Sequence, residues 1–135
     1  MGPNDVELVR VFTRMPGETI GDLTFPSTSN IDVVVEAEHG AALLGMAYQC
    51  GVIVRDLEDN QNIDVAVGTN PVTGAIGMGG DPWAAPGHQF PFTVPAANIA
   101  LLAGHVCEVV AYMKVGAGPA TDISFATSPR FIIEP

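Results

Sequence analysis

The amino-acid sequence predicts an all-β fold, a two-sheet antiparallel sandwich of seven or eight strands with one short helical turn. Runs of β-branched and aromatic residues recur along the chain, each bounded by Gly, Pro, Asn, Asp or Ser, which is typical of an antiparallel β domain. Within the runs apolar and polar residues alternate, so each strand has one buried face, as in two packed sheets. At 135 residues the chain has the length of one domain, and we expect a single domain over residues 1–135.

Seven strands are predicted, in chain order, over residues 6–12, 31–39, 45–57, 62–68, 88–94, 105–115 and 122–133. A weaker run over 19–25 follows the Pro16-Gly17 turn and can continue the first strand after a break. One segment, "PAANIALLAG" over 95–104, begins with proline and ends with glycine, which predicts a short helical turn between two strands.

Alternation also predicts which side of each strand is buried. The apolar rows are Ile31, Val33, Val35 and Ala37; Met46, Tyr48, Cys50, Val52 and Val54; Cys107, Val109, Ala111, Met113 and Val115; and Ile123, Phe125, Phe131 and Ile133. We expect these rows to form the core between the two sheets.

The C-terminal sequence "GHVCEVVAYMKVGAGPATDISFATSPRFIIEP" resembles the last hairpin of bacterial immunoglobulin-like domains, in which a long strand, a glycine-rich turn and a final strand close one sheet. With the strand count, the resemblance implies a sandwich of the immunoglobulin or fibronectin type III kind. The chain departs from antibody-type domains because its third strand has no tryptophan and no tyrosine-corner spacing precedes Cys107. The resemblance is to an architecture; it identifies no specific family and implies no functional residues.

The chain is strongly acidic, with 15 Asp and Glu against five Lys and Arg and a formal net charge of −10. This charge repels nucleic acid phosphates and anionic lipid headgroups, so we expect neither nucleic acid nor a membrane as partner. No basic and apolar leader follows Met1, which favours a cytoplasmic location. The alternative is a secreted mature form cut from a longer precursor.

The two cysteines, Cys50 and Cys107, both point inward by alternation, on what would be neighbouring strands of one sheet. We expect two buried, reduced thiols that pack as small hydrophobes, with a disulfide as the alternative. A catalytic thiolate is disfavoured, because apolar burial raises the pKa of a thiol.

The turn "RDLEDNQNID" places five oxygen-bearing side chains at alternate positions, which is the spacing of the first ligands in a calcium loop. The five residues are Asp56, Glu58, Asn60, Asn62 and Asp64. However, Gln61 stands where such a loop requires glycine, and Val67 stands where it requires the bidentate glutamate. We therefore expect a solvated turn that binds calcium weakly, and no other cofactor.

Other patterns give little support for an enzyme. His39, His88 and His105 lie at strand ends, but none of them has the local spacing of a zinc motif. Neither Ser124 nor Ser128 lies in a nucleophile elbow. The glycines of "GAIGMGGD" imitate a dinucleotide fingerprint without the helix that must follow.

Residues 68–90, "GTNPVTGAIGMGGDPWAAPGHQF", are rich in glycine and proline and contain the only tryptophan. A long segment of this kind in a compact domain is usually functional or disordered. We expect it to be ordered on its own sandwich, with a short edge strand near 75–78; a contact with another subunit and disorder are the alternatives. The candidate residues for a partner or ligand are Ile76, Met78, Asp81, Trp83 and His88, since aromatic residues and Met are enriched at interface cores.

Two functions remain open from the sequence. The first is a non-catalytic binding or assembly module that meets a protein partner, or a second copy of itself, through an edge strand and the 68–90 segment. The second is a small-ligand or metal-binding module with a pocket lined by Trp83, His88 and the acidic turn 56–64. The first is favoured, because no set of nucleophile, base and oxyanion donors is recognisable.

Overall fold

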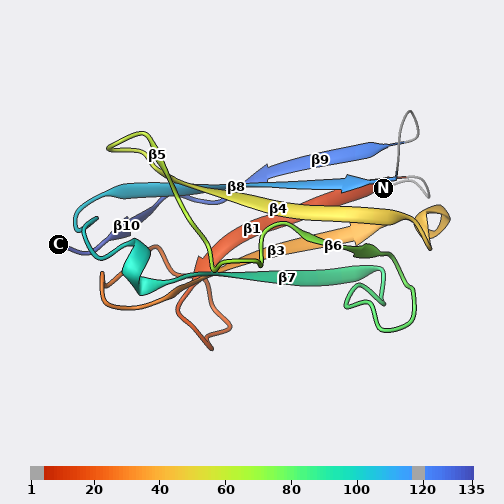
Figure 1. Ribbon diagram of the computed structural model, residues 1–135, viewed down its shortest axis with the longest axis horizontal. Helices are drawn as coiled ribbons and strands as arrows, with labels where there is room; N and C mark the ends of the chain where they lie inside the picture. The colour runs from red at the N-terminus through yellow and green to blue at the C-terminus, as the bar shows by residue number, and fades with distance from the viewer. Residues whose placement is uncertain (1–4, 117–120) are drawn as a thin grey trace.

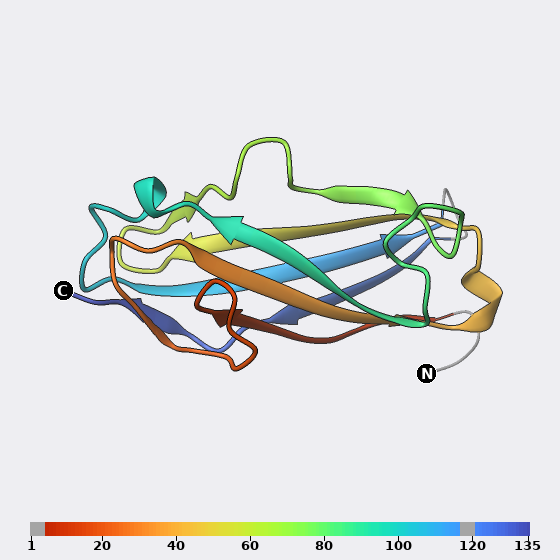
Figure 2. The ribbon, with the colours of Figure 1, turned by 90° about the horizontal axis from the view of Figure 1, so that it is seen from below.

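The protein is a sandwich of two β-sheets, seen here in a computed structural model that describes residues 5–116 and 121–135. Its described strands are β1 (Val6–Arg14), β2 (Thr24–Phe25), β3 (Ile31–His39), β4 (Ala47–Asp56), β5 (Gln61–Ile63), β6 (Val72–Ala75), β7 (Gly87–Val94), β8 (Val106–Val115), β9 (Asp122–Thr127) and β10 (Phe131–Ile133). The small sheet has the order β1-β3-β7, and the large sheet has the order β2-β10-β8-β4-β5, with β6 also paired to β4 and β9 to β8. The long strands of both sheets run along the long axis of the molecule (Figure 1), and β3 and β7 cross over β4 and β8 in the turned view (Figure 2). The predicted all-β sandwich is confirmed.

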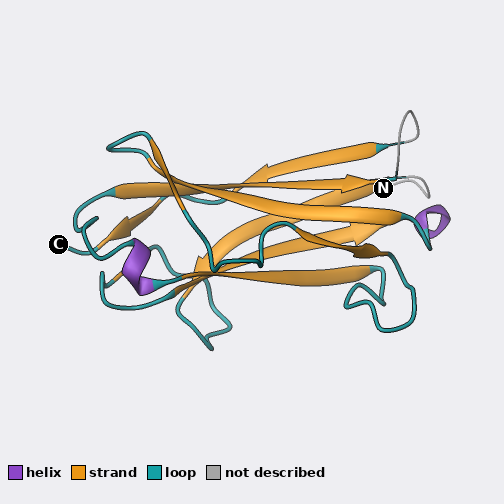
Figure 3. Cartoon of the chain, viewed as in Figure 1, coloured by secondary structure: helices purple, strands orange, loops and turns teal. Residues whose placement is uncertain are grey.

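The helical content of the described residues is two 3-10 turns of three residues each, η1 (Ala41–Leu43) and η2 (Ala96–Asn98) (Figure 3). The η2 turn lies inside the predicted segment 95–104. The η1 turn was not predicted, because it has no proline or side-chain cap at its start. Neither turn has the length to cross a membrane.

The strand count exceeds the predicted seven or eight because one predicted strand divides and the 68–90 segment contributes another. The run over 122–133 forms β9 and β10, interrupted at Pro129, which has no N–H for a ladder. The 68–90 segment contains β6, which begins three residues before the predicted edge strand 75–78 and overlaps it only at Ala75. The glycine-rich turn before β9 includes residues 117–120, which lie outside the described residues.

Two other predicted strands are shorter than expected. The run over 62–68 forms only β5, because the chain then leaves the large sheet and Ala66 N–H donates to Thr93 O of β7 at 2.9 Å. The run over 19–25 forms only β2, which pairs in parallel with β10 and does not continue β1.

The break between β5 and β6 leaves a gap along β4, and the break between β9 and β10 leaves a gap along β8. Asn70 and Ser128 fill these two gaps. On β4, the Asn70 amide lies between β5 and β6; its Nδ2 donates to Val52 O at 2.8 Å, and its Oδ1 accepts from Val52 N at 3.1 Å. On β8, Ser128 lies between β9 and β10; its N–H donates to Val109 O at 2.9 Å, and its Oγ accepts from Val109 N at 3.0 Å. Each gap therefore keeps its backbone hydrogen bonds without a strand residue.

The predicted apolar rows of β3, β4 and β8 form the core, with Met46 only partly buried. The last predicted row is wrong in part: Phe131 and Ile133 are buried, but Ile123 and Phe125 are 51% and 70% exposed. The break between β9 and β10 changes the phase of alternation, so the two halves of the row lie on opposite faces of the sheet.

The inward face of β9 carries polar side chains that bond to the backbone of β1, which explains why Ile123 and Phe125 face outward. Asp122 Oδ2 accepts from Val6 N–H at 2.8 Å, and Ser124 Oγ accepts from Leu8 N–H at 3.1 Å. Polar side chains of the large sheet thus satisfy the open edge of β1, which limits strand addition there.

Candidate functional site

The segment 68–90 is ordered against its own sandwich, with Trp83 at its centre. The indole of Trp83 is 0% exposed and makes edge-to-face contacts with His39, Tyr48 and Phe90, with ring centroids 5.1, 5.2 and 5.5 Å away. Its Nε1 donates to Pro86 O at 3.2 Å. The tryptophan therefore closes one end of the core, as the first of the three predicted alternatives requires.

A single carboxylate holds this segment in place. Asp81 Oδ1 accepts from Tyr48 Oη and from Trp83 N at 2.8 Å each, and Oδ2 accepts from Ala75 N at 3.0 Å. Burial opposes ionisation of Asp81, but these hydrogen bonds outweigh it and lower the pKa of the carboxyl. Burial and the bond to Asp81 raise the pKa of Tyr48. The space for the carboxylate exists because residue 74 is glycine: a Cβ there would lie 2.1 Å from Asp81 Oδ2.

The five candidate partner residues therefore differ in what they can contact. Ile76 is fully buried like Trp83, and Asp81 bonds to Tyr48 of β4 and to two N–H groups of the segment. The ring of His88 packs on Phe90 with centroids 4.6 Å apart. Only Met78 is prominently exposed, at 55%.

Three of the five alternating side chains of the acidic turn bond to groups of the protein. The Arg55 guanidinium donates to both Asn60 and Asn62. Asp56 is buried, and its Oδ1 accepts from Glu58 N at 3.0 Å. These bonds engage three of the five candidate ligands, and the weak calcium binding of the turn stays a prediction.

A different group of possible ligands does come together at this turn. Asp56, Asp59 and His105 each offer a ligand atom, and these atoms lie within 4.8 Å of one another. His105 Nδ1 lies 2.9 Å from Asp56 Oδ2 and 3.9 Å from Asp59 Oδ2. The hydrogen bond to Asp56 raises the pKa of His105; burial opposes ionisation of Asp56, but the bonds from His105 and two backbone N–H groups lower its pKa. The alternate spacing used to predict the calcium ligands omits Asp59. The fold of the turn nevertheless brings the Asp59 carboxylate near Asp56 and His105.

The predicted pocket between Trp83, His88 and the acidic turn does not form. The β4–β5 turn and the β6–β7 connection lie at opposite ends of the long axis (Figure 1). The same separation divides the histidines, since His39 and His88 lie at the tryptophan end and His105 at the other. The sequence places all three at strand ends but does not decide which ends meet.

The two cysteines are buried and unpaired, on neighbouring strands of one sheet as predicted. In the β4–β8 ladder Cys50 faces Met113, whereas Cys107 faces Asp56, six rungs away. At about 3.3 Å per residue the two thiols cannot bridge. Burial raises the pKa of each thiol to about 12, so neither is a ready nucleophile.

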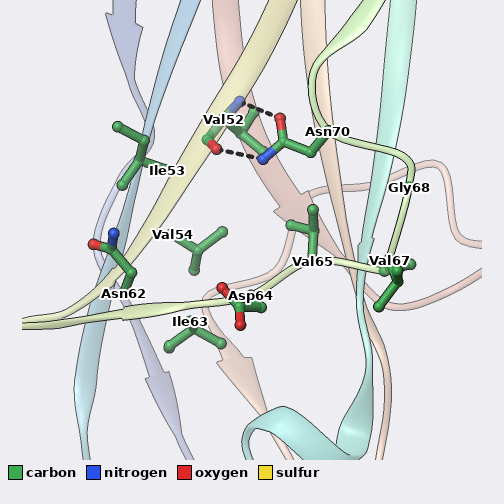
Figure 4. Close-up of a pocket in the computed structure, with 11 residues that line it drawn as sticks. Val52, Ile53, Val54, Asn62, Ile63, Asp64, Val65, Val67, Gly68 and Asn70 are labelled. Atoms are coloured by element: carbon green, nitrogen blue, oxygen red, sulfur yellow. Dashed lines mark hydrogen bonds between the residues drawn. The ribbon is translucent and has the colours of Figure 1, made fainter.

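An open pocket of about 370 Å³ lies along the edge of β4 (Figure 4). Figure 4 shows the Asn70 amide at one end of this pocket and Asp64 near Val65 at the other. Two residues of the predicted acidic turn, Asn62 and Asp64, line it. The pocket arises where the chain leaves the large sheet after β5 for the small sheet, and both polar and apolar groups line it.

The outer face of the large sheet carries an apolar group that the sequence analysis did not single out. We call it the apolar patch: Ile53, Val110, Tyr112, Ile123 and Phe125. Register places these residues beside one another, because Ile53 faces Val110 across β4 and β8, and Tyr112 faces Phe125 across β8 and β9. Ile53 is 44% exposed, in addition to the two exposed residues of β9.

Gly51 makes this patch flat at its centre. The Tyr112 ring lies across Gly51, where a Cβ would be 2.4 Å from Tyr112 Cε1. Gln49 Nε2 donates to Tyr112 Oη at 2.7 Å and holds the ring down. The signal available in the sequence was that the inward positions of β9 carry polar or small residues, Asp122, Ser124 and Ala126, which the hydrogen bonds of the first two to the β1 backbone explain.

No protein-family model and no curated protein matches the chain. Among solved structures, the C-terminal domain of wzt has 13% identity and a TM-score of 0.50, and the match covers 98% of this chain and 70% of that one. AggA, the major subunit of aggregative adherence fimbriae type I from Escherichia coli, has 11% identity and a TM-score of 0.51, covering 96% of this chain and 95% of that one. Both are immunoglobulin-like β-sandwiches, so the predicted architecture is confirmed; at such identities the likeness concerns the fold alone.

Proposed function

We propose that the protein is a non-catalytic binding or assembly module that contacts a protein partner or a second copy of itself. The apolar patch carries this proposal, since the side chains of Phe125 and Ile123 are exposed on the outer face and do not pack in the core. Exposed aromatic and aliphatic groups on one face are typical of interaction surfaces. The fimbrial subunit among the similar structures is an assembling protein with this architecture, which is compatible with the proposal.

The open strand edges support the proposal less than this face does. On β6, Ala75 N–H donates to Asp81 and Ala75 O accepts from Met78 N–H at 3.2 Å. On β7, Thr93 O is taken by Ala66, and Pro91 has no N–H to offer. A partner strand would find few free groups, so we place the contact on the face, with Met78 of the 68–90 segment as a separate and smaller contact.

The test replaces Phe125 with serine and uses Val67→Ser as the matched control. Val67 is fully exposed but lies outside the patch. Sedimentation of purified protein over a concentration series, and capture of partners from a lysate on immobilised protein, measure the two forms of association. We expect Phe125→Ser to reduce association or capture and Val67→Ser to leave both unchanged. Equal behaviour of the two variants would exclude the patch as the binding surface.

A second candidate function is a weak cation site at Asp56, Asp59 and His105, which the closeness of their ligand atoms favours. Imidazole suits zinc or nickel, whereas calcium prefers oxygen ligands. Binding must displace the proton that Asp56 stabilises on His105, so affinity should rise with pH. Calorimetry should give a calcium dissociation constant no lower than millimolar. A micromolar dissociation constant for the wild-type protein, with no binding by Asp56→Ala, would place the cation site ahead of the apolar patch as the candidate function.

A further inference from the structure

The two outer faces of the sandwich differ in charge. On the large sheet, the charged residues at outward strand positions are Arg55, Glu108 and Lys114, and Glu108 lies 3.6 Å from Arg130. Among the ion pairs of the described residues none involves Lys114, which stands beside Ile123 in the β8–β9 ladder. The apolar patch therefore has a free cation at its border, on a chain whose net charge is −10.

The small sheet has the opposite balance. Arg10 bonds to Glu36, and Arg14 lies 3.4 Å from Asp32, so these four charges cancel. Glu7 and Glu38 remain, directly opposite each other on β1 and β3. Like charges across a strand pair are destabilising, and within the described residues neither carboxylate pairs with a cation.

A hollow of about 520 Å³ lies beside this pair of glutamates. Its lining includes Val9, Glu36, Glu38, Gly87 and Gln89. The bulge between Leu8 and Arg10 turns Val9 outward, 50% exposed, and Gly87 contributes no side chain where it faces Glu38. The hollow thus has an apolar wall, an acidic rim and room for an aromatic ring.

We propose that the chain assembles head to tail, with the apolar patch of one copy docking on the small sheet of the next, Phe125 in the hollow and Lys114 facing Glu38. This inference rests on the proposed binding function and names the partner as a second copy. The contact joins two different surfaces, so it does not close on itself as a two-fold dimer does; it builds a ring or an open chain, according to the rotation between copies, and the oligomer population grows with concentration. It also relieves the Glu7–Glu38 repulsion, because a cation is brought to the pair.

Charge reversal gives a test that other modes of association do not pass. Lys114→Glu should make the patch repel the acidic hollow, and Glu38→Lys should make the hollow repel the patch, each weakening association by about 10-fold or more. In an equimolar mixture the acidic patch of Lys114→Glu meets the basic hollow of Glu38→Lys, and Lys114 of Glu38→Lys meets the unchanged Glu38 of Lys114→Glu. Sedimentation velocity should therefore show each variant as a monomer and the mixture as alternating oligomers.

Controls separate this inference from the broader function. Glu18→Lys changes the net charge equally at an exposed site outside the hollow and should leave association unchanged, while Phe125→Ala should weaken it by about 30-fold or more. Circular dichroism checks that each variant is folded. Association that is sensitive to Phe125 but not restored by mixing would overturn head-to-tail docking and leave the binding function standing. A wild-type protein that stays monomeric at millimolar concentration overturns the docking; if Phe125→Ser also changes no capture, the proposed function fails with it.

Discussion

Replacing Trp83 with alanine should cost the protein about 4 kcal/mol of folding stability, because the indole closes one end of the core. A buried aromatic side chain removes about 150–250 Å² from water, and at about 25 cal/mol per Å² this gives about 4–6 kcal/mol, which is an upper bound because the unfolded chain already buries part of this area. Large-to-small substitutions of buried aromatic residues cost about 3–5 kcal/mol in practice. Trp83 falls in this range because it is fully buried and its ring meets three others edge to face.

Urea unfolding followed by far-ultraviolet circular dichroism measures this loss, since the variant has no tryptophan fluorescence. Met78→Ala is the control in the same segment, and its effect should stay within about 0.5 kcal/mol because Met78 is exposed. In the wild-type protein, the emission of Trp83 should be blue-shifted and protected from quenchers. A loss below about 1.5 kcal/mol, against the range known for such substitutions, would refute the assignment of Trp83 to the core.

Three further predictions concern the rest of the chain. The raised pKa of His105 adds stability that is lost as pH rises above about 6.5, and the lowered pKa of Asp56 adds stability that is lost as pH falls below about 4. The pair should therefore stabilise most between these values, and Asp56→Asn should flatten the pH profile of thermal unfolding; an unchanged profile contradicts the pairing. Gly74→Ala should destabilise by about 1–3 kcal/mol, the cost of displacing the buried, hydrogen-bonded carboxylate of Asp81, and a neutral effect in urea unfolding would show that the carboxylate moves freely. Thiol titration of the denatured, never-reduced protein should find two free sulfhydryls, and finding none would mean that the two cysteines are bridged.

Local pattern in the sequence determined the fold class and much of the core. Alternation over residues 31–39 matches β3 and its buried row, and the same rule placed both cysteines inward on neighbouring strands. These predictions succeed because a strand that packs on a core must repeat with a period of two, whatever its neighbours are. The order of the 68–90 segment was predictable for a similar local reason. Prolines on both sides of Trp83 restrict the backbone, and a large indole ring favours burial against the protein.

Only the tertiary structure decided which segments meet, and it is there that the predictions fail. The sequence treated Ile123 and Phe125 as core, but Asp122 and Ser124 of β9 point inward and accept hydrogen bonds from the backbone of β1, which leaves the two apolar residues exposed. It also joined the acidic turn to Trp83, although β4 holds them at opposite ends. Both errors have one physical cause: periodicity reports that a strand has two faces, whereas the partner on each face is set by hydrogen bonds and packing between residues far apart in the chain.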